Sequence, residues 1–179
     1  MMSDWKLSTW TDAAQLAASV NPREVPDEAR GLAPVEWFIH LRNAGKSTYA
    51  VNFLAHAMPR YECVVWAART LIELGADRTD PTLVAALRWI DNPSDRLRRD
   101  AAELGDTLDD DTPQALLCKA IFLSGGSISE EDLPAIQPPP DVCAKLAAAA
   151  VLTAAFTSKA PSDAIATSLH LGESVLAGA

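Results

Sequence analysis

The clearest pattern of hydrophobic and polar positions lies between Met58 and Gly75. Pro59 opens this stretch, Gly75 closes it, and apolar residues recur at spacings of three and four, as on one face of a helix. The residues of this main stripe are Tyr61, Val64, Val65, Ala68, Leu71 and Ile72. A second apolar stripe lies beside it, and a helix that is apolar over most of its circumference packs in the interior. We therefore expect residues 58–75 to form the central helix of the fold.

Polar side chains form only a narrow strip on this helix. Glu62, Arg69 and Glu73 make up the strip, Trp66 lies among them, and Arg60 stands at the helix start. Arginine and tryptophan are enriched where proteins bind their partners, so the strip is a candidate binding face. The alternative is an internal salt bridge with Trp66 packed beside it. The candidate binding residues are Arg60, Glu62, Trp66 and Arg69.

Start and stop signals divide the remaining chain into further helices. Several starts pair a capping side chain with a proline at the first helical position, where the missing N–H has no cost. These starts are Asp80-Pro81, Asn92-Pro93 and Thr112-Pro113. Thr11 is the expected cap of the first helix, and Asn92 with Asp95 resembles a capping box. Besides the central helix, the expected helices cover about residues 12–20, 34–43, 49–58, 81–91, 93–104, 113–124, 142–158 and 163–176.

This pattern predicts an all-α fold of about eight helices with no significant sheet. A compact orthogonal bundle and a short αα-superhelical, repeat-like array both fit, because the helix starts are unevenly spaced. We expect an N-terminal arm and short helix at residues 1–33 and a single helical domain at residues 34–179. Residues 127–140, which include three consecutive prolines, are expected to form an extended connector.

Charge and cysteine content narrow the functional classes. The net charge of −9 does not suit nucleic acid, because neutralising phosphates requires a basic face. The longest apolar window, residues 146–156, is about half the length of a membrane span, so we expect no membrane insertion. The three cysteines include no Cys-x-x-Cys pair, and no signal peptide is visible. We therefore expect a cytoplasmic protein with reduced thiols.

Three segments resemble the signature of an uncharacterised family of bacterial all-helical proteins. They cover residues 49–69, 86–99 and 120–127, and the first contains the run Phe53-Leu54-Ala55-His56-Ala57-Met58-Pro59-Arg60. The resemblance extends over about residues 34–179. It implies a helical bacterial protein of unknown function, and it supplies no catalytic residues.

Motifs of known chemistry are incomplete in this sequence. Gly45-Lys46-Ser47 ends like a phosphate-binding loop, but His40 stands where the motif needs a glycine, so a helix-ending glycine explains it better. The three histidines lie on separate expected helices. The acidic run at residues 106–111 lacks the glycine and final glutamate of a calcium loop. We expect no catalytic residues, no metal and no cofactor.

These observations leave three functional hypotheses. The first is a non-enzymatic protein-interaction or scaffold module that binds another protein, since the chain combines a helical pattern with an acidic surface and no catalytic constellation. The second is a small-molecule or anion-binding protein, or an enzyme, with a site near Arg60, Glu62 and Arg69 that includes one histidine. A deep pocket with perturbed pKa values would favour it. The third is a homo-oligomer formed through the alanine-rich helix at residues 141–158.

Overall fold

The computed structural model describes residues 5–130 and 132–179. Over these residues the fold is all-α, with nine α-helices, one 3-10 turn and no strand, which confirms the predicted fold class. The elements are α1 (Ala13–Val20), η1 (Asp27–Ala29), α2 (Pro34–Asn43), α3 (Ser47–Ala57), α4 (Arg60–Glu73), α5 (Pro81–Asp91), α6 (Asp95–Gly105), α7 (Pro113–Phe122), α8 (Val142–Thr157) and α9 (Pro161–Leu176).

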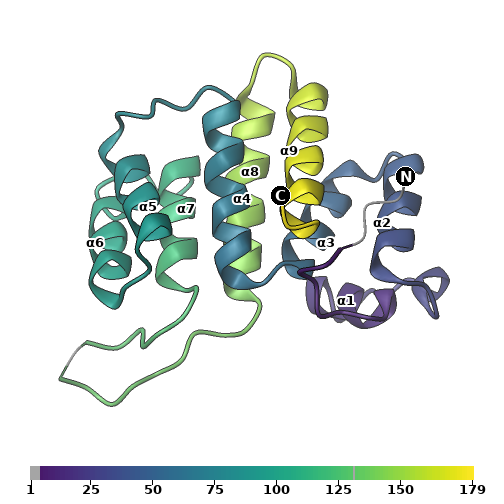
Figure 1. Cartoon of the computed structure of the whole chain (residues 1–179), viewed down its shortest axis with the longest axis horizontal. Coiled ribbons are helices and arrows are strands. Elements are labelled where there is room, and N and C mark those ends of the chain that lie inside the picture. The colour runs from purple at the N-terminus through teal and green to yellow at the C-terminus, as the bar shows by residue number, and fades with distance from the viewer. Residues whose placement is uncertain (1–4, 131) are drawn as a thin grey trace.

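The helices stand side by side along the longest axis of the molecule (Figure 1). α5, α6 and α7 form one end, α1, α2 and α3 form the other, and α4, α8 and α9 lie between them (Figure 1). α8 packs against α3, α4, α7 and α9, and α4 packs against α5, α7, α8 and α9. Because α8 contacts helices from both ends, the buried side chains join into one continuous core.

α4 is buried as predicted, but two of its aromatic residues differ from the prediction in their exposure to solvent. Trp66 has no exposed surface, although its sequence position falls among the polar residues of the strip. Tyr61, which belongs to the main apolar stripe, is 39% exposed. Trp66 faces α9, where Gly172 has no side chain to occupy the space, and a Cβ at Gly172 would lie 3.0 Å from Trp66 Nε1. The sequence pattern predicts that this helix has several neighbours, but it does not predict the distance between the helix and each of them.

The alanine-rich helix α8 shares the centre of the fold with α4. Small side chains let neighbouring helices approach closely, so a helix of alanines suits a position between several others. Its buried residues are Cys143, Ala144, Ala147, Ala148, Ala150, Val151 and Ala155. These alanines pack within the chain, so they do not form a free face for a second copy.

Most helix starts lie at or near the predicted positions, and some caps differ. Thr112 caps α7 with its side chain, as predicted. Asp12, rather than Thr11, caps α1, because its carboxylate accepts a backbone hydrogen bond at 2.9 Å. Ser94, rather than Asn92, caps α6. The predicted capping box is therefore wrong, and the reason is that Asn92 still belongs to the end of α5, where its N–H donates to a helix carbonyl.

Residues 127–140 connect α7 to α8 as an extended loop that projects beyond the helices (Figure 1). Its described part contains neither helix nor strand, as the prolines predict. The loop leaves the fold beside the starts of α4 and α8 (Figure 1). A cavity lined by Arg60 and a groove lined by Tyr61 both lie at this end of the helices.

Candidate functional site

The structure separates the four binding residues predicted from the sequence. Trp66 points into the core, and its indole N–H donates to the carbonyl of Ser168 on α9 at 2.8 Å. Arg69 is exposed and approaches the carbonyl of Ala179 at 3.5 Å. Arg60 and Arg69 are nine positions apart, which is about 13 Å along a helix. Arg60 lines the cavity described below, to which the other three do not contribute, and Glu62, two positions later, is half-buried.

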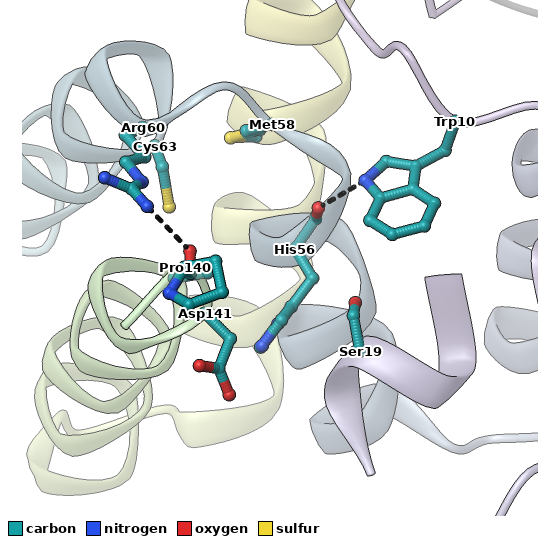
Figure 2. A pocket seen from close by; sticks show the side chains of 9 residues that line it. Trp10, Ser19, His56, Met58, Arg60, Cys63, Pro140 and Asp141 are labelled. Atoms are coloured by element: carbon teal, nitrogen blue, oxygen red, sulfur yellow. Dashed lines mark hydrogen bonds between the residues drawn. The ribbon is translucent and has the colours of Figure 1, made fainter. Parts of the chain in front are cut away.

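The cavity encloses about 210 Å³ where α3 ends and where α4 and α8 begin (Figure 2). Residues from the N-terminal arm and α1 complete its wall, which is mostly apolar. The apolar lining consists of Trp10, Met58, Cys63, Pro140 and Ala144. The polar lining consists of Ser19, His56, Arg60 and Asp141.

His56 is the buried polar group of this cavity. It lies in the last turn of α3 and is 7% exposed. Its Nδ1 lies 2.8 Å from the carbonyl of Asn52. A carbonyl can only accept, so Nδ1 carries the hydrogen and Nε2 of the neutral ring presents a lone pair. Nε2 is buried and has no hydrogen-bond partner among the described residues.

Burial keeps His56 in its neutral form. Desolvation lowers the pKa of His56 below its ordinary value, and the charge of Lys145 lowers it further. The Asn52 carbonyl and the charge of Asp141 oppose this shift without reversing it. Neutral imidazole accepts a hydrogen bond at Nε2, so this residue of the cavity wall carries a buried acceptor that has no partner among the described residues.

Arg60 brings a positive charge to the opposite wall (Figure 2). It is half-buried, and its guanidinium donates to the carbonyls of Ser124 at 3.3 Å and Pro140 at 3.5 Å. Both bonds are long and go to neutral acceptors. No carboxylate in the described part of the chain forms an ion pair with Arg60.

Asp141 does not neutralise this arginine. It occupies the N-cap position of α8 but makes no capping hydrogen bond, and its carboxylate pairs with Lys145 one turn later. The hydrogen bond from Lys145 lowers the pKa of Asp141. The N-terminus of a helix carries a partial positive charge. The start of α8 and Arg60 therefore both favour a negative group in the cavity.

The hydroxyl and thiol of the cavity are not activated for nucleophilic attack. Ser19 donates its hydroxyl hydrogen to the carbonyl of Leu16 at 2.7 Å. Burial raises the pKa of the Cys63 thiol well above its ordinary value, and the nearby Cys143 and Glu62 raise it further. A nucleophile requires a base within hydrogen-bond reach or a lowered pKa. The arrangement is suited to binding.

The N-terminal arm closes one side of the cavity. The indole N–H of Trp10 donates to the carbonyl of His56 at 3.0 Å and holds the arm against the end of α3 (Figure 2). The sequence hypothesis of a site with Arg60 and one histidine contains two of the lining residues. It missed Trp10 and Asp141, because Trp10 and His56 are 46 positions apart and no local signal links them.

The other sequence motifs have structural explanations or remain isolated. Gly45 has a φ of 70°, the left-handed conformation of a helix-ending glycine, after the end of α2. In the acidic run, Asp110 pairs with Lys119 at 2.5 Å. The described residues contain no group of three or more side chains placed to hold a metal ion. None of the described helices is long and apolar enough to span a membrane.

Comparison with known proteins identifies a family for this chain. No curated protein and no solved structure matches it. The model of a family of unknown function (DUF6931) matches residues 37–176. The match includes His56, Arg60 and Asp141, and it begins after Trp10 and Ser19. Since the match covers well over half of the sequence, the chain belongs to this family of unknown function, DUF6931.

Proposed function

We propose that this protein binds a small organic anion in the cavity between α3, α4 and α8. The observation that carries the proposal is the Nε2 atom of His56, a residue of the cavity wall: this atom is buried and unpaired among the described residues. A buried polar atom without a partner costs about 1–3 kcal/mol, and native proteins rarely retain one without a reason. A ligand with an O–H or N–H donor would remove this cost.

The wall of the cavity indicates the other parts of the ligand. Trp10 and Met58 offer apolar surface to a short hydrocarbon body, and Arg60 offers N–H donors to a carboxylate. The volume of about 210 Å³ corresponds to roughly seven water-sized groups at about 30 Å³ each. The expected ligand is a small monocarboxylate that also carries a hydroxyl or amino group.

A thermal-shift and calorimetric screen tests the proposal. The probes are 2-hydroxy and 2-amino monocarboxylates of about three to six carbons, a size set by the cavity. The matched amides and the carboxylates without the hydroxyl serve as controls. A ligand present at about 100 times its Kd adds about 2.7 kcal/mol to the free energy of unfolding. For a chain of this size, the melting temperature then rises by about 5–10 °C.

Two variants assign the binding to the cavity. His56→Phe removes the acceptor and keeps the ring volume, and Arg60→Gln removes the charge. We expect each to weaken binding at least tenfold, whereas His170→Phe, at an exposed histidine on α9, leaves it unchanged. The proposal fails if no probe raises the melting temperature, or if both cavity variants bind as tightly as the unmodified protein.

A role in protein interaction remains a second proposal. It follows from the sequence, which suggests a scaffold module of the bacterial cytoplasm. All three cysteines are buried and free, which supports a reducing compartment. The exposure of large apolar side chains on and near the connector supports a partner.

A further inference from the structure

A groove of about 330 Å³ lies beside the start of α4, at the same end of the helices as the cavity. Two aromatic rings form part of its wall: Tyr61, which is 39% exposed, and Trp89, with ring centres 5.8 Å apart. The hydroxyl of Tyr61 donates to the carbonyl of Ile90 at 2.9 Å, which fixes the orientation of the exposed ring. The remaining wall includes Ser124 and Gly125, which lead directly into the connector.

Two arginines of α6 hold the base of the connector. Arg98 is 3% exposed and donates to the carbonyl of Ser127 at 2.7 Å. Arg99 donates to Ser127 at 3.2 Å and to Ser129 at 3.0 Å. The carboxylate of Asp95 accepts from Arg98 at 2.5 Å and from Arg99 at 2.9 Å, and these bonds lower its pKa. We call Asp95, Arg98 and Arg99 the clamp.

The connector also has an internal structure. The backbone N–H of Ile128 donates to the carbonyl of Ile136 at 2.8 Å, and the N–H of Ile136 donates to the hydroxyl of Ser127 at 3.1 Å. Ser129 closes the next turn through a hydroxyl bond of 2.7 Å to the carbonyl of Pro134. These bonds hold the first and last segments of the loop together at the clamp.

The loop presents apolar side chains to water. Leu133 is 53% exposed and Ile136 is 56% exposed. Together with Tyr61 they are three of the four large hydrophobic side chains exposed in the described chain, and the fourth, Phe156, lies near the far end of α8. Asp141 to Phe156 is about 22 Å along that helix. A loop whose base is fixed by hydrogen bonds loses less entropy when it binds, so exposed apolar side chains on such a loop suit recognition.

We propose that this groove and the clamped loop form the docking surface for a protein segment that is apolar and basic. The inference rests on the interaction role suggested by the sequence and is independent of ligand binding in the cavity. Charge complementarity selects the partner: residues 127–140 contain three acidic residues and no basic one, and the whole chain carries −9. A second copy of this chain would bring the same negative charges, so it is a poor occupant.

A selection from a phage library of random peptides tests the surface without a known partner. The bait is the full-length protein, and enriched peptides are synthesised and titrated by fluorescence polarisation. We expect enriched peptides to combine leucine- or aromatic-type residues with lysine or arginine, and their binding to weaken as salt rises. A Leu133→Ser, Ile136→Ser double variant is expected to bind at least about tenfold more weakly.

Phe156→Ser is the matched control, because Phe156 is 55% exposed and lies away from the loop. It is expected to bind within about twofold of the unmodified protein. The assignment of this surface would be overturned if the loop variant bound the peptides as tightly as the unmodified protein, or if the Phe156 variant lost as much affinity as the loop variant. Enrichment of acidic peptides would overturn it too. A selection that enriches no peptide above an uncoated control would overturn the interaction role itself, and neither result affects the ligand screen.

Discussion

Replacing Gly172 with alanine is expected to destabilise the fold, although alanine is the better helix former. Gly172 lies within α9, four residues before its last residue, Leu176, and faces the ends of three buried side chains. A Cβ at this position would stand 2.0 Å from Leu54 Cδ2, 3.0 Å from Trp66 Nε1 and 3.1 Å from Met58 Cε. Leu54 and Trp66 have no exposed surface, so they have no open space into which to move.

The expected magnitude follows from opposing terms. Alanine in place of glycine gains about 1 kcal/mol of helix propensity. An ordinary carbon–carbon contact is about 3.5–4.0 Å, so Leu54 and the new Cβ must move apart by about 1.5–2 Å, and such overpacking costs about 1–3 kcal/mol. If α9 shifts instead, it stretches the bond from Trp66 to Ser168, which contributes about 1 kcal/mol. After the gain in helix propensity is subtracted, the free energy of unfolding should fall by up to about 2 kcal/mol.

Urea unfolding of a double-mutant cycle measures this clash directly. The four proteins are the unmodified chain, Gly172→Ala, Leu54→Ala and the double variant. Leu54→Ala alone should cost about 2–5 kcal/mol, but it empties the space that the new Cβ needs. In that background Gly172→Ala should be neutral or stabilising by up to about 1 kcal/mol. The packing argument is refuted if Gly172→Ala stabilises the chain by the same amount in both backgrounds.

Three other measurements test the core, the cavity and the clamp. Trp66→Phe should lower the free energy of unfolding by about 1–2 kcal/mol through loss of the bond to Ser168, and Trp66→Ala by about 3–5 kcal/mol; unchanged stability in urea would contradict a core position. Because the pKa of His56 is lower in the folded chain than in the unfolded one, its contribution is complete above about pH 6.5 and is lost as the pH falls below that value. This loss should be absent in His56→Phe and present in His170→Phe when unfolding is followed between about pH 7.5 and 5. Asp95→Asn should speed hydrogen exchange at the base of the connector, and unchanged exchange would show that the arginines hold the loop without their carboxylate.

Local sequence signals predicted the helices well, because the atoms that define a helix start are close together in the chain. Thr112 followed by proline places a cap and a pre-set φ within two residues, and α7 begins there. The errors occur where two helices nearly touch. Asn92 has the side chain of a cap, but only the structure shows that it ends α5 while Ser94 starts α6.

The arrangement of the helices could not be predicted to the same extent. The apolar stripes of residues 58–75 predict burial, and α4 is buried. They do not predict that α8 shares the centre, because alanines give a helix little hydrophobic contrast between its faces. Nor do they show that Trp66 is buried, because its pocket depends on Gly172, 106 positions later by residue number (172 − 66). Close approach between helices depends on pairs of residues that no local window contains.

The candidate site was half predictable for the same reason. Arg60 stood out in the sequence because a charged residue begins an otherwise apolar helix, and it does line the cavity. His56 lies only four positions earlier, but Met58 and Pro59 turn the chain between them, so helical spacing does not relate the two side chains. Arg60 also donates to Ser124, which lines the groove, and to Pro140, where the connector ends. One arginine thus lines the cavity and bonds to a residue of the groove wall, which places the two candidate sites next to each other although 64 positions separate Arg60 from Ser124.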